Sequence, residues 1–130
     1  MANANKRKGD RAERAVRDWA VSRYADSFKT RAGFNDDIGD VLVTHPAGLI
    51  VLQVKDVASP AWSTWFSQLH SQVTACLNHV RGTRRVMGGV IVHKRRGSAN
   101  PGDWRVVTTL DDMDTLITNA YAAGYLDASD

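Results

Sequence analysis

Residues 40–56 have the sequence DVLVTHPAGLIVLQVKD, which is the part of the chain most informative about its architecture. Apolar and β-branched residues predict two strands, 40–44 and 49–57, and the residues 45–48 between them predict a turn. Since side chains alternate along a strand, Ile50 and Val54 should face one way, and Gln53 and Lys55 the other. The stretch therefore predicts a β-hairpin whose second strand is apolar on both faces except at its end.

Helical and extended patterns alternate outward from this hairpin. Apolar spacing predicts a helix over about 10–24, and a loop is expected at 31–39. Ser59-Pro60 should begin a second helix that ends before Gly82. Strands are expected at 86–94 and 104–109, followed by a last helix capped by Asp111 and ended by Gly124. The predicted fold is α/β, a mixed central sheet of about four strands flanked by helices, in the order α-β-β-α-β-β-α.

Length and composition predict one domain that works in the cytoplasm. A chain of 130 residues fits a single domain, which we expect at 9–130, preceded by a flexible basic arm at 1–8. No apolar run approaches the roughly 20 residues that span a bilayer, and the N-terminal residues do not resemble a signal peptide. The single cysteine, Cys76, excludes an internal disulfide and a multi-cysteine zinc site.

The charges are segregated along the chain. Residues 1–31 hold nine Lys/Arg against four acids, residues 81–105 hold seven against one, and residues from 111 onward hold five acids and no Lys/Arg. Two basic blocks in a short domain are typical of a protein that binds a polyanion, although a solvated basic surface would have the same composition. The expected contacts to a DNA backbone are Lys6, Arg7, Lys8, Arg11, Arg14, Arg17, Lys94, Arg95 and Arg96.

Polar groups at the ends of the two hairpin strands predict a metal site. Pairing of the strands would bring Asp40 beside Gln53 and Lys55, and such groups at the end of an apolar strand are costly unless they are paired or bind something. Asp40, the Gln53 amide oxygen and the Val54 carbonyl are oxygen ligands of the kind that Mg²⁺ prefers. Lys55 could orient water or stabilise charge that develops on a phosphate. The expected cofactor is Mg²⁺ or Mn²⁺.

This pattern resembles the PD-(D/E)XK nuclease superfamily, and within it the small Holliday junction resolvases of archaea and phages. The resemblance runs from about Lys8 to Val80. It implies a restriction-endonuclease-like core, with Glu13 as an acidic ligand on the first helix, Asp40 as the strand acid, and Gln53-Val54-Lys55 as the (D/E)-x-K motif. It also implies cleavage of branched DNA such as four-way junctions by a homodimer, in the host cytoplasm if a phage encodes the chain. No phosphate loop is present, so no nucleotide cofactor is expected.

One residue departs from the family pattern and leaves alternatives open. Gln53 stands where Glu or Asp is usual, and a neutral amide binds a hard cation more weakly; Asp56, or Asp36 and Asp37, could compensate. The chain could be a nuclease for flaps, forks or plain duplex, an inactive DNA-binding relative, or a basic scaffold without a DNA role. Gln68 is a further site candidate. The aromatic residues Trp62, Trp65 and Phe66 could stack on bases, although their helical spacing favours core packing.

Overall fold

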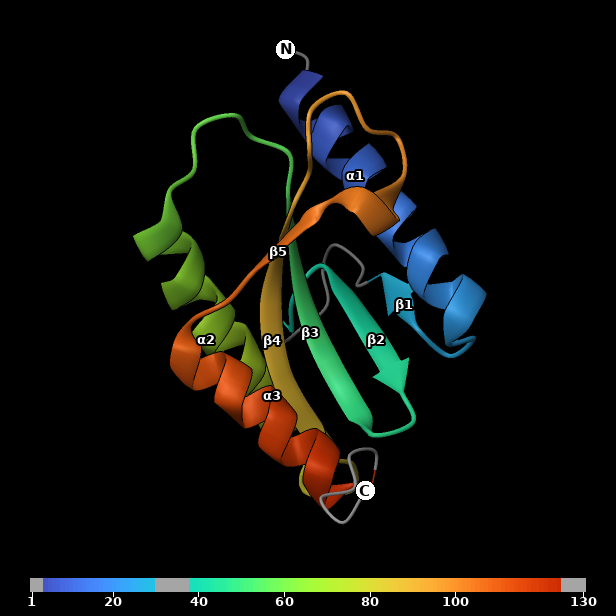
Figure 1. Cartoon of the computed structure of the whole chain (residues 1–130), viewed down its shortest axis with the longest axis vertical. Helices are drawn as coiled ribbons and strands as arrows, with labels where there is room; N and C mark the ends of the chain where they lie inside the picture. Colours follow the sequence, from blue (N-terminus) through green and yellow to red (C-terminus); the bar gives the residue numbers. More distant parts are fainter. Residues whose placement is uncertain (1–3, 30–37, 125–130) are drawn as a thin grey trace.

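A computed structural model of the chain describes residues 4–29 and 38–124. It is an α/β fold in which a five-stranded mixed sheet is flanked by three helices (Figure 1). The elements are α1 (Ala4–Arg23), β1 (Phe28–Lys29), β2 (Val41–His45), β3 (Gly48–Lys55), α2 (Trp62–Val80), β4 (Val86–His93), the 3-10 turn η1 (Pro101–Asp103), β5 (Arg105–Val107) and α3 (Leu110–Ala122). The fold class is confirmed, but the strand count of about four and the exact element order are not.

The sheet order is β1-β2-β3-β4-β5, so chain order is also spatial order. The predicted hairpin is present: β2 and β3 pair antiparallel, with Val41 opposite Leu52 and His45 opposite Gly48. β3 and β4 pair parallel, and α2 provides the crossover between them. The outer pairs β1–β2 and β4–β5 are antiparallel.

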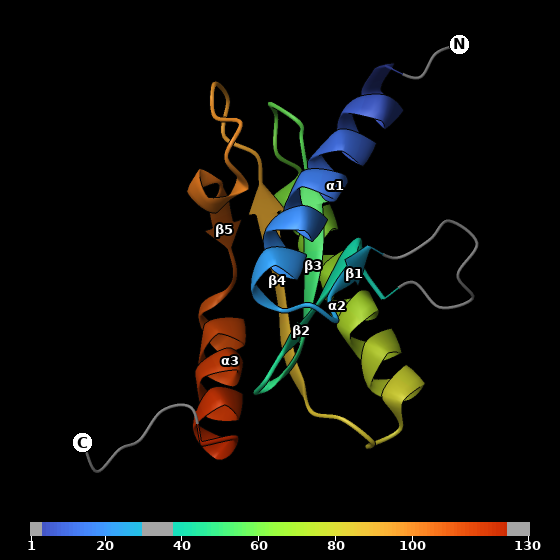
Figure 2. The ribbon, with the colours of Figure 1, turned by 90° about the vertical axis from the view of Figure 1, so that its right-hand side faces the viewer.

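Two apolar cores lie on opposite faces of this sheet, as the alternation in the hairpin predicts. One core contains Leu52 and Val54 with α1 residues such as Val16, and the other contains Val51 with α2 residues such as Leu69. α2 lies on one face, whereas α1 and α3 lie against the other (Figure 2). The close approach of α2 to β4 depends on Gly89, where a Cβ would lie 2.8 Å from side-chain carbons of Leu69 and Val73.

Several expected element ends are wrong. α1 begins at Ala4 and not near Asp10, so residues 4–8, expected in a flexible arm, are helical; Ala, Lys and Arg are strong helix formers. Ser59-Pro60 does not begin α2, whose N-cap is Ala61 with no side-chain cap. Asp111 is not the cap of α3 either, since the Thr109 hydroxyl accepts a hydrogen bond from the Asp112 N–H.

Candidate functional site

Two hydrogen bonds to the backbone of β3 hold Asp40 in place immediately before β2. Its N–H donates to the carbonyl of Leu52 (2.9 Å), and its carboxylate oxygen Oδ2 accepts from the N–H of Val54 (2.8 Å). The preceding Gly39 has φ +97°, and a Cβ there would lie 2.6 Å from Cγ1 of Val51. The position therefore requires glycine, and this conformation sets where the Asp40 carboxylate lies.

Gln53 and Lys55 lie at the end of β3, on the face that α2 covers. Gln53 is 1% exposed, and its Nε2 donates to Oε1 of Gln68 (3.3 Å) and Oε1 of Gln72 (3.5 Å). Its own Oε1 is buried and has no hydrogen-bond partner among the described residues. The Lys55 ammonium lies 5.4 Å from the ring centre of Trp65. A buried, unpartnered carbonyl oxygen is uncommon and is a reason to look for a ligand.

Glu13 comes to the same site from α1. The pKa of Glu13 is raised from 4.5 to about 7, mainly by burial and then by the Asp40 and Asp10 carboxylates, whereas Lys29 and Lys55 act to lower it. Glu13 Oε1 also lies 3.8 Å from Nζ of Lys29 on β1. Because Asp40 and Lys55 both act on its pKa, the structure brings Glu13, from a distant part of the sequence, close to the residues of the hairpin.

These groups form an oxygen-rich set that fits a divalent cation. In the described residues, no three His, Cys, Asp or Glu side chains are grouped closely enough to hold a metal. The oxygens that could hold an ion are instead those of two carboxylates, Glu13 and Asp40, and the Oε1 of Gln53, which has no hydrogen-bond partner within the described part of the chain. The N–H and C=O of one strand residue point to the same side, so the Val54 carbonyl faces the side of β3 where Asp40 accepts the Val54 N–H. Hard oxygen donors of this kind suit Mg²⁺ or Mn²⁺.

Asp56 is engaged by two lysines and not by the groups around Asp40. Its carboxylate oxygens lie 3.5 Å from Nζ of Lys8 and 3.6 Å from Nζ of Lys94, and its side chain is 12% exposed. These ion pairs join the start of α1 to the segment that follows β4. Asp56 therefore forms ion pairs that hold two basic segments together, which is a different role from adding a carboxylate to the metal site in compensation for Gln53.

The same segments enclose a basic hollow. The hollow measures about 470 Å³ and is lined in part by Lys8, Lys94, Arg95, Arg96 and Arg105. Lys8 and Lys94 share the Asp56 carboxylate, so the two basic blocks meet at one end of the sheet (Figure 1).

The other predicted DNA contacts lie along α1. Lys6, Arg7, Arg11 and Arg14 are exposed. Arg17 is half-buried and forms an ion pair with the neighbouring Asp18 at 2.8 Å. α1 therefore presents exposed cations along its first half, and Arg17 further along is paired with an acid.

The remaining site candidates have different outcomes. Asp36 and Asp37 lie outside the described residues. Gln68 does reach the site through Gln53, and the buried Gln72, which the sequence did not single out, joins it there. The signal was two glutamines spaced i,i+4 on α2. Trp65 is buried, as core packing predicts, but Trp62 is 36% exposed and stacks edge-on against His93.

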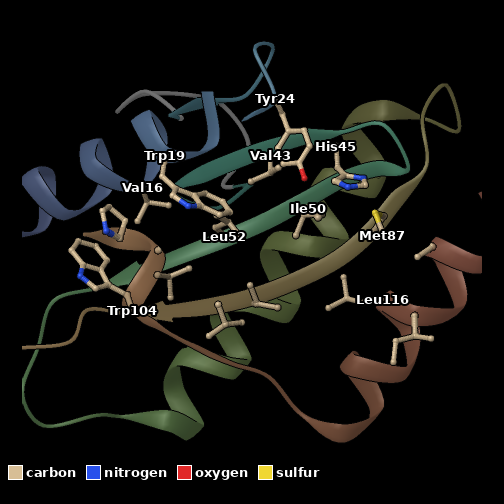
Figure 3. Close-up of a pocket in the computed structure, with 17 residues that line it drawn as sticks. Val16, Trp19, Tyr24, Val43, His45, Ile50, Leu52, Met87, Trp104 and Leu116 are labelled. Atoms are coloured by element: carbon tan, nitrogen blue, oxygen red, sulfur yellow. The ribbon is translucent and has the colours of Figure 1, made fainter. Parts of the chain in front are cut away.

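A second, apolar hollow lies between α1 and α3, on the face of the sheet opposite to α2 (Figure 3). It measures about 460 Å³, and its lining includes Trp19, Tyr24, Ile50, Trp104 and Leu116. α3 beside it has no buried residue, and Leu110, Met113, Ile117 and Tyr121 on it are exposed. This face is therefore an apolar surface that the described part of the chain leaves uncovered.

Comparison of the chain with protein-family models, curated proteins and solved structures found no match. Within residues 4–29 and 38–124, no helix has the length and apolar character needed to cross a membrane.

Proposed function

We propose that this chain is a metal-dependent endonuclease of the PD-(D/E)XK type that cleaves branched DNA, with four-way junctions as the substrate. The observation that carries the proposal is the hairpin site. The Asp40 carboxylate accepts a hydrogen bond from the Val54 N–H, between Gln53 and Lys55 of the expected motif, and it is close enough to Glu13 of α1 to raise the pKa of that residue. These are the four side chains that the resemblance to resolvases implies, and the cytoplasm is the compartment that fits this role.

The residues of the chain divide the work of phosphodiester hydrolysis. Glu13, Asp40, the Gln53 amide and the Val54 carbonyl would hold the ion. A bound Mg²⁺ or Mn²⁺ supplies a Lewis acid that neutralises phosphate charge and makes water more acidic. The Lys55 ammonium would orient the attacking water and stabilise the negative charge that develops on the phosphate oxygens as the P–O bond to the leaving oxygen breaks. Trp65, packed against Lys55, limits where that ammonium can point.

The basic surface supplies a path for the phosphate backbone. Lys8, Lys94 and Arg96 lie around one hollow, and Lys6 and Arg7 continue the positive surface along α1. Backbone contacts of this kind position DNA without selecting a sequence, which suits an enzyme that recognises DNA shape. Trp62, exposed at the beginning of α2, could stack on an unpaired base near a branch point.

Pairing of two copies would match the two-fold symmetry of a junction. The uncovered face with its apolar hollow is our candidate for the dimer interface, with a second copy as occupant. α3 carries three aspartates and no Lys or Arg, whereas Arg23 stacks on Trp19 at the rim of the hollow, so α3 of one copy and α1 of the other are complementary in charge. Light scattering should give the mass of a dimer, and Ile117→Asp should give that of a monomer.

Gln53 favours a second candidate function, that of a DNA-binding relative without catalysis. An amide in place of the usual carboxylate lowers the charge that holds the ion. In that case the chain would bind junctions with salt-dependent affinity and would not bind Mn²⁺ measurably.

Cleavage assays on defined DNA structures test these possibilities. End-labelled four-way junction, flap, fork and linear duplex would be incubated with Mg²⁺ or Mn²⁺ and with wild type, Asp40→Asn or Asp26→Asn. Asp40→Asn keeps an oxygen that can accept the Val54 N–H and removes one charge, and Asp26→Asn makes the same chemical change at an exposed place in the turn after α1.

Preferential nicking of the junction by wild type and Asp26→Asn, absent in Asp40→Asn and in EDTA, supports the proposal. Equal cutting of all four substrates would leave a nuclease without junction specificity. Junction binding without cutting under either metal would favour the inactive relative.

A further inference from the structure

We infer that Gln72, acting with Gln68, is a positioning residue that fixes the Gln53 amide so that its oxygen, not its nitrogen, faces the proposed metal site. The inference rests on the proposed metal-dependent function and assigns a role to α2 within it. A glutamine side chain can present either its NH₂ donor or its carbonyl acceptor to a given point, and only the carbonyl oxygen can bind a cation.

The hydrogen bonds around Gln53 decide which end is offered. Its Nε2 has two hydrogens, and the structure gives it two acceptors, Oε1 of Gln68 at 3.3 Å and Oε1 of Gln72 at 3.5 Å. Both acceptors come from α2, one turn apart, on the side of the strand that this helix covers. The amide nitrogen is thus satisfied on the α2 side, and Oε1 remains buried without a hydrogen-bond partner in the described part of the chain.

Burial makes this orientation persistent. Gln53 is 1% exposed and Gln72 is 6% exposed, so little water can reach their amides to replace the hydrogen bonds between them. Turning the Gln53 amide over would place its oxygen against two oxygens and its nitrogen toward the site, unless both partner amides turned with it. An isolated glutamine at position 53 would lack this constraint.

Gln72 also reaches the segment that positions Asp40. Its Oε1 would lie 3.8 Å from a Cβ at Gly39, the residue immediately before Asp40. Gln72 is therefore adjacent both to the proposed amide ligand and to the backbone of the proposed carboxylate ligand. Partners that orient a ligand in this way change metal affinity by about 10- to 100-fold when they are removed.

Calorimetric titration of Mn²⁺ into the metal-free protein tests the inference without depending on activity. The variants are Gln72→Met, which removes the acceptor at similar size, Gln72→Glu, which keeps an acceptor, Gln53→Met, and the double Gln53→Met/Gln72→Met. Asn78→Ala, at an exposed place on the same helix, is the control. Far-UV circular dichroism and thermal unfolding in EDTA show whether each variant is folded.

Gln72→Met should weaken Mn²⁺ binding by about 10- to 100-fold, and Gln72→Glu should retain it. The double variant should bind no more weakly than Gln53→Met, because Gln72 acts through Gln53. The inference would be overturned if Gln72→Met bound Mn²⁺ with wild-type affinity or if Gln72→Glu lost Mn²⁺ affinity. It would also be overturned if the fold-losses in affinity of the two single Met variants multiplied in the double variant. Wild type that binds no Mn²⁺ would overturn the proposed function and this inference together, whereas binding that Gln72→Met leaves unchanged would overturn the inference alone.

Discussion

Replacement of Gly39 by alanine tests how the chain positions Asp40. Gly39 has φ +97°, where a side chain costs about 1–2 kcal/mol. The new Cβ would also lie 2.6 Å from Cγ1 of Val51, which is fully buried, and forced packing of this kind costs about 1–3 kcal/mol. The two costs together predict a loss of about 2–5 kcal/mol in the free energy of unfolding.

Gly97→Ala is the matched control. Gly97 has φ +78°, and no atom of the described residues lies within 4 Å of a Cβ placed there, so only the conformational cost of about 1–2 kcal/mol applies. Urea unfolding followed by circular dichroism would measure both variants, together with Gly39→Ala in a Val51→Ala background, where the contact is relieved. Gly39→Ala should be the more destabilised single variant, and Val51→Ala should recover part of its loss relative to additivity.

Equal destabilisation of Gly39→Ala and Gly97→Ala would mean that the contact between a Cβ at position 39 and Val51 costs nothing. Strict additivity of Gly39→Ala and Val51→Ala would lead to the same conclusion. In either case the conformation before Asp40 would not depend on the close approach of β3.

Three further changes probe the charges of the site. Burial and Asp40 raise the pKa of Glu13 to about 7, so the folded state binds this proton more tightly than the unfolded state and loses stability as pH rises from about 4.5 through 7. Glu13→Gln should therefore raise Tm at pH 8 more than at pH 4.5. An equal change in Tm at both pH values would contradict this prediction. Gln53→Glu introduces a carboxylate and should tighten Mn²⁺ binding in calorimetry, because Gln68 and Gln72 can turn their NH₂ groups toward the new carboxylate. Weaker Mn²⁺ binding by this variant would count against the metal site. Arg96→Ala should weaken junction binding and reduce the slope of log K against log salt by about 1, and an unchanged slope would mean that Arg96 makes no phosphate contact.

The hairpin and its two faces could be predicted from sequence because their signals are local. Alternation along 49–55 places Val51 and Val54 on opposite faces, and the two apolar cores confirm it. β1 was missed because Phe28 and Lys29 have no strand pattern of their own; they become a strand by pairing with Leu42 and Val41. Tertiary pairing, not local preference, determines such short elements.

The candidate site could be predicted only in part, because tertiary contacts between separate segments determine some of its geometry. Asp40, Gln53 and Lys55 are connected by a hairpin, so their proximity follows from one predicted turn. The burial of Gln72 depends on how α2 rotates over β3, which its amphipathic pattern does not specify to within one side chain. Sequence spacing also could not show that Asp56 would be held by Lys8 and Lys94, because that contact joins three separate segments.

The proposed endonuclease activity is tested by mapping the nicks in a four-way junction that is labelled on each strand in turn, with Mn²⁺ present. We expect wild type to make paired nicks related by the two-fold symmetry of the junction, and we expect Asp40→Asn to bind the junction without nicking it. Intact strands under conditions where wild type binds the junction, or equal nicking by Asp40→Asn, would rule out this activity at the proposed site.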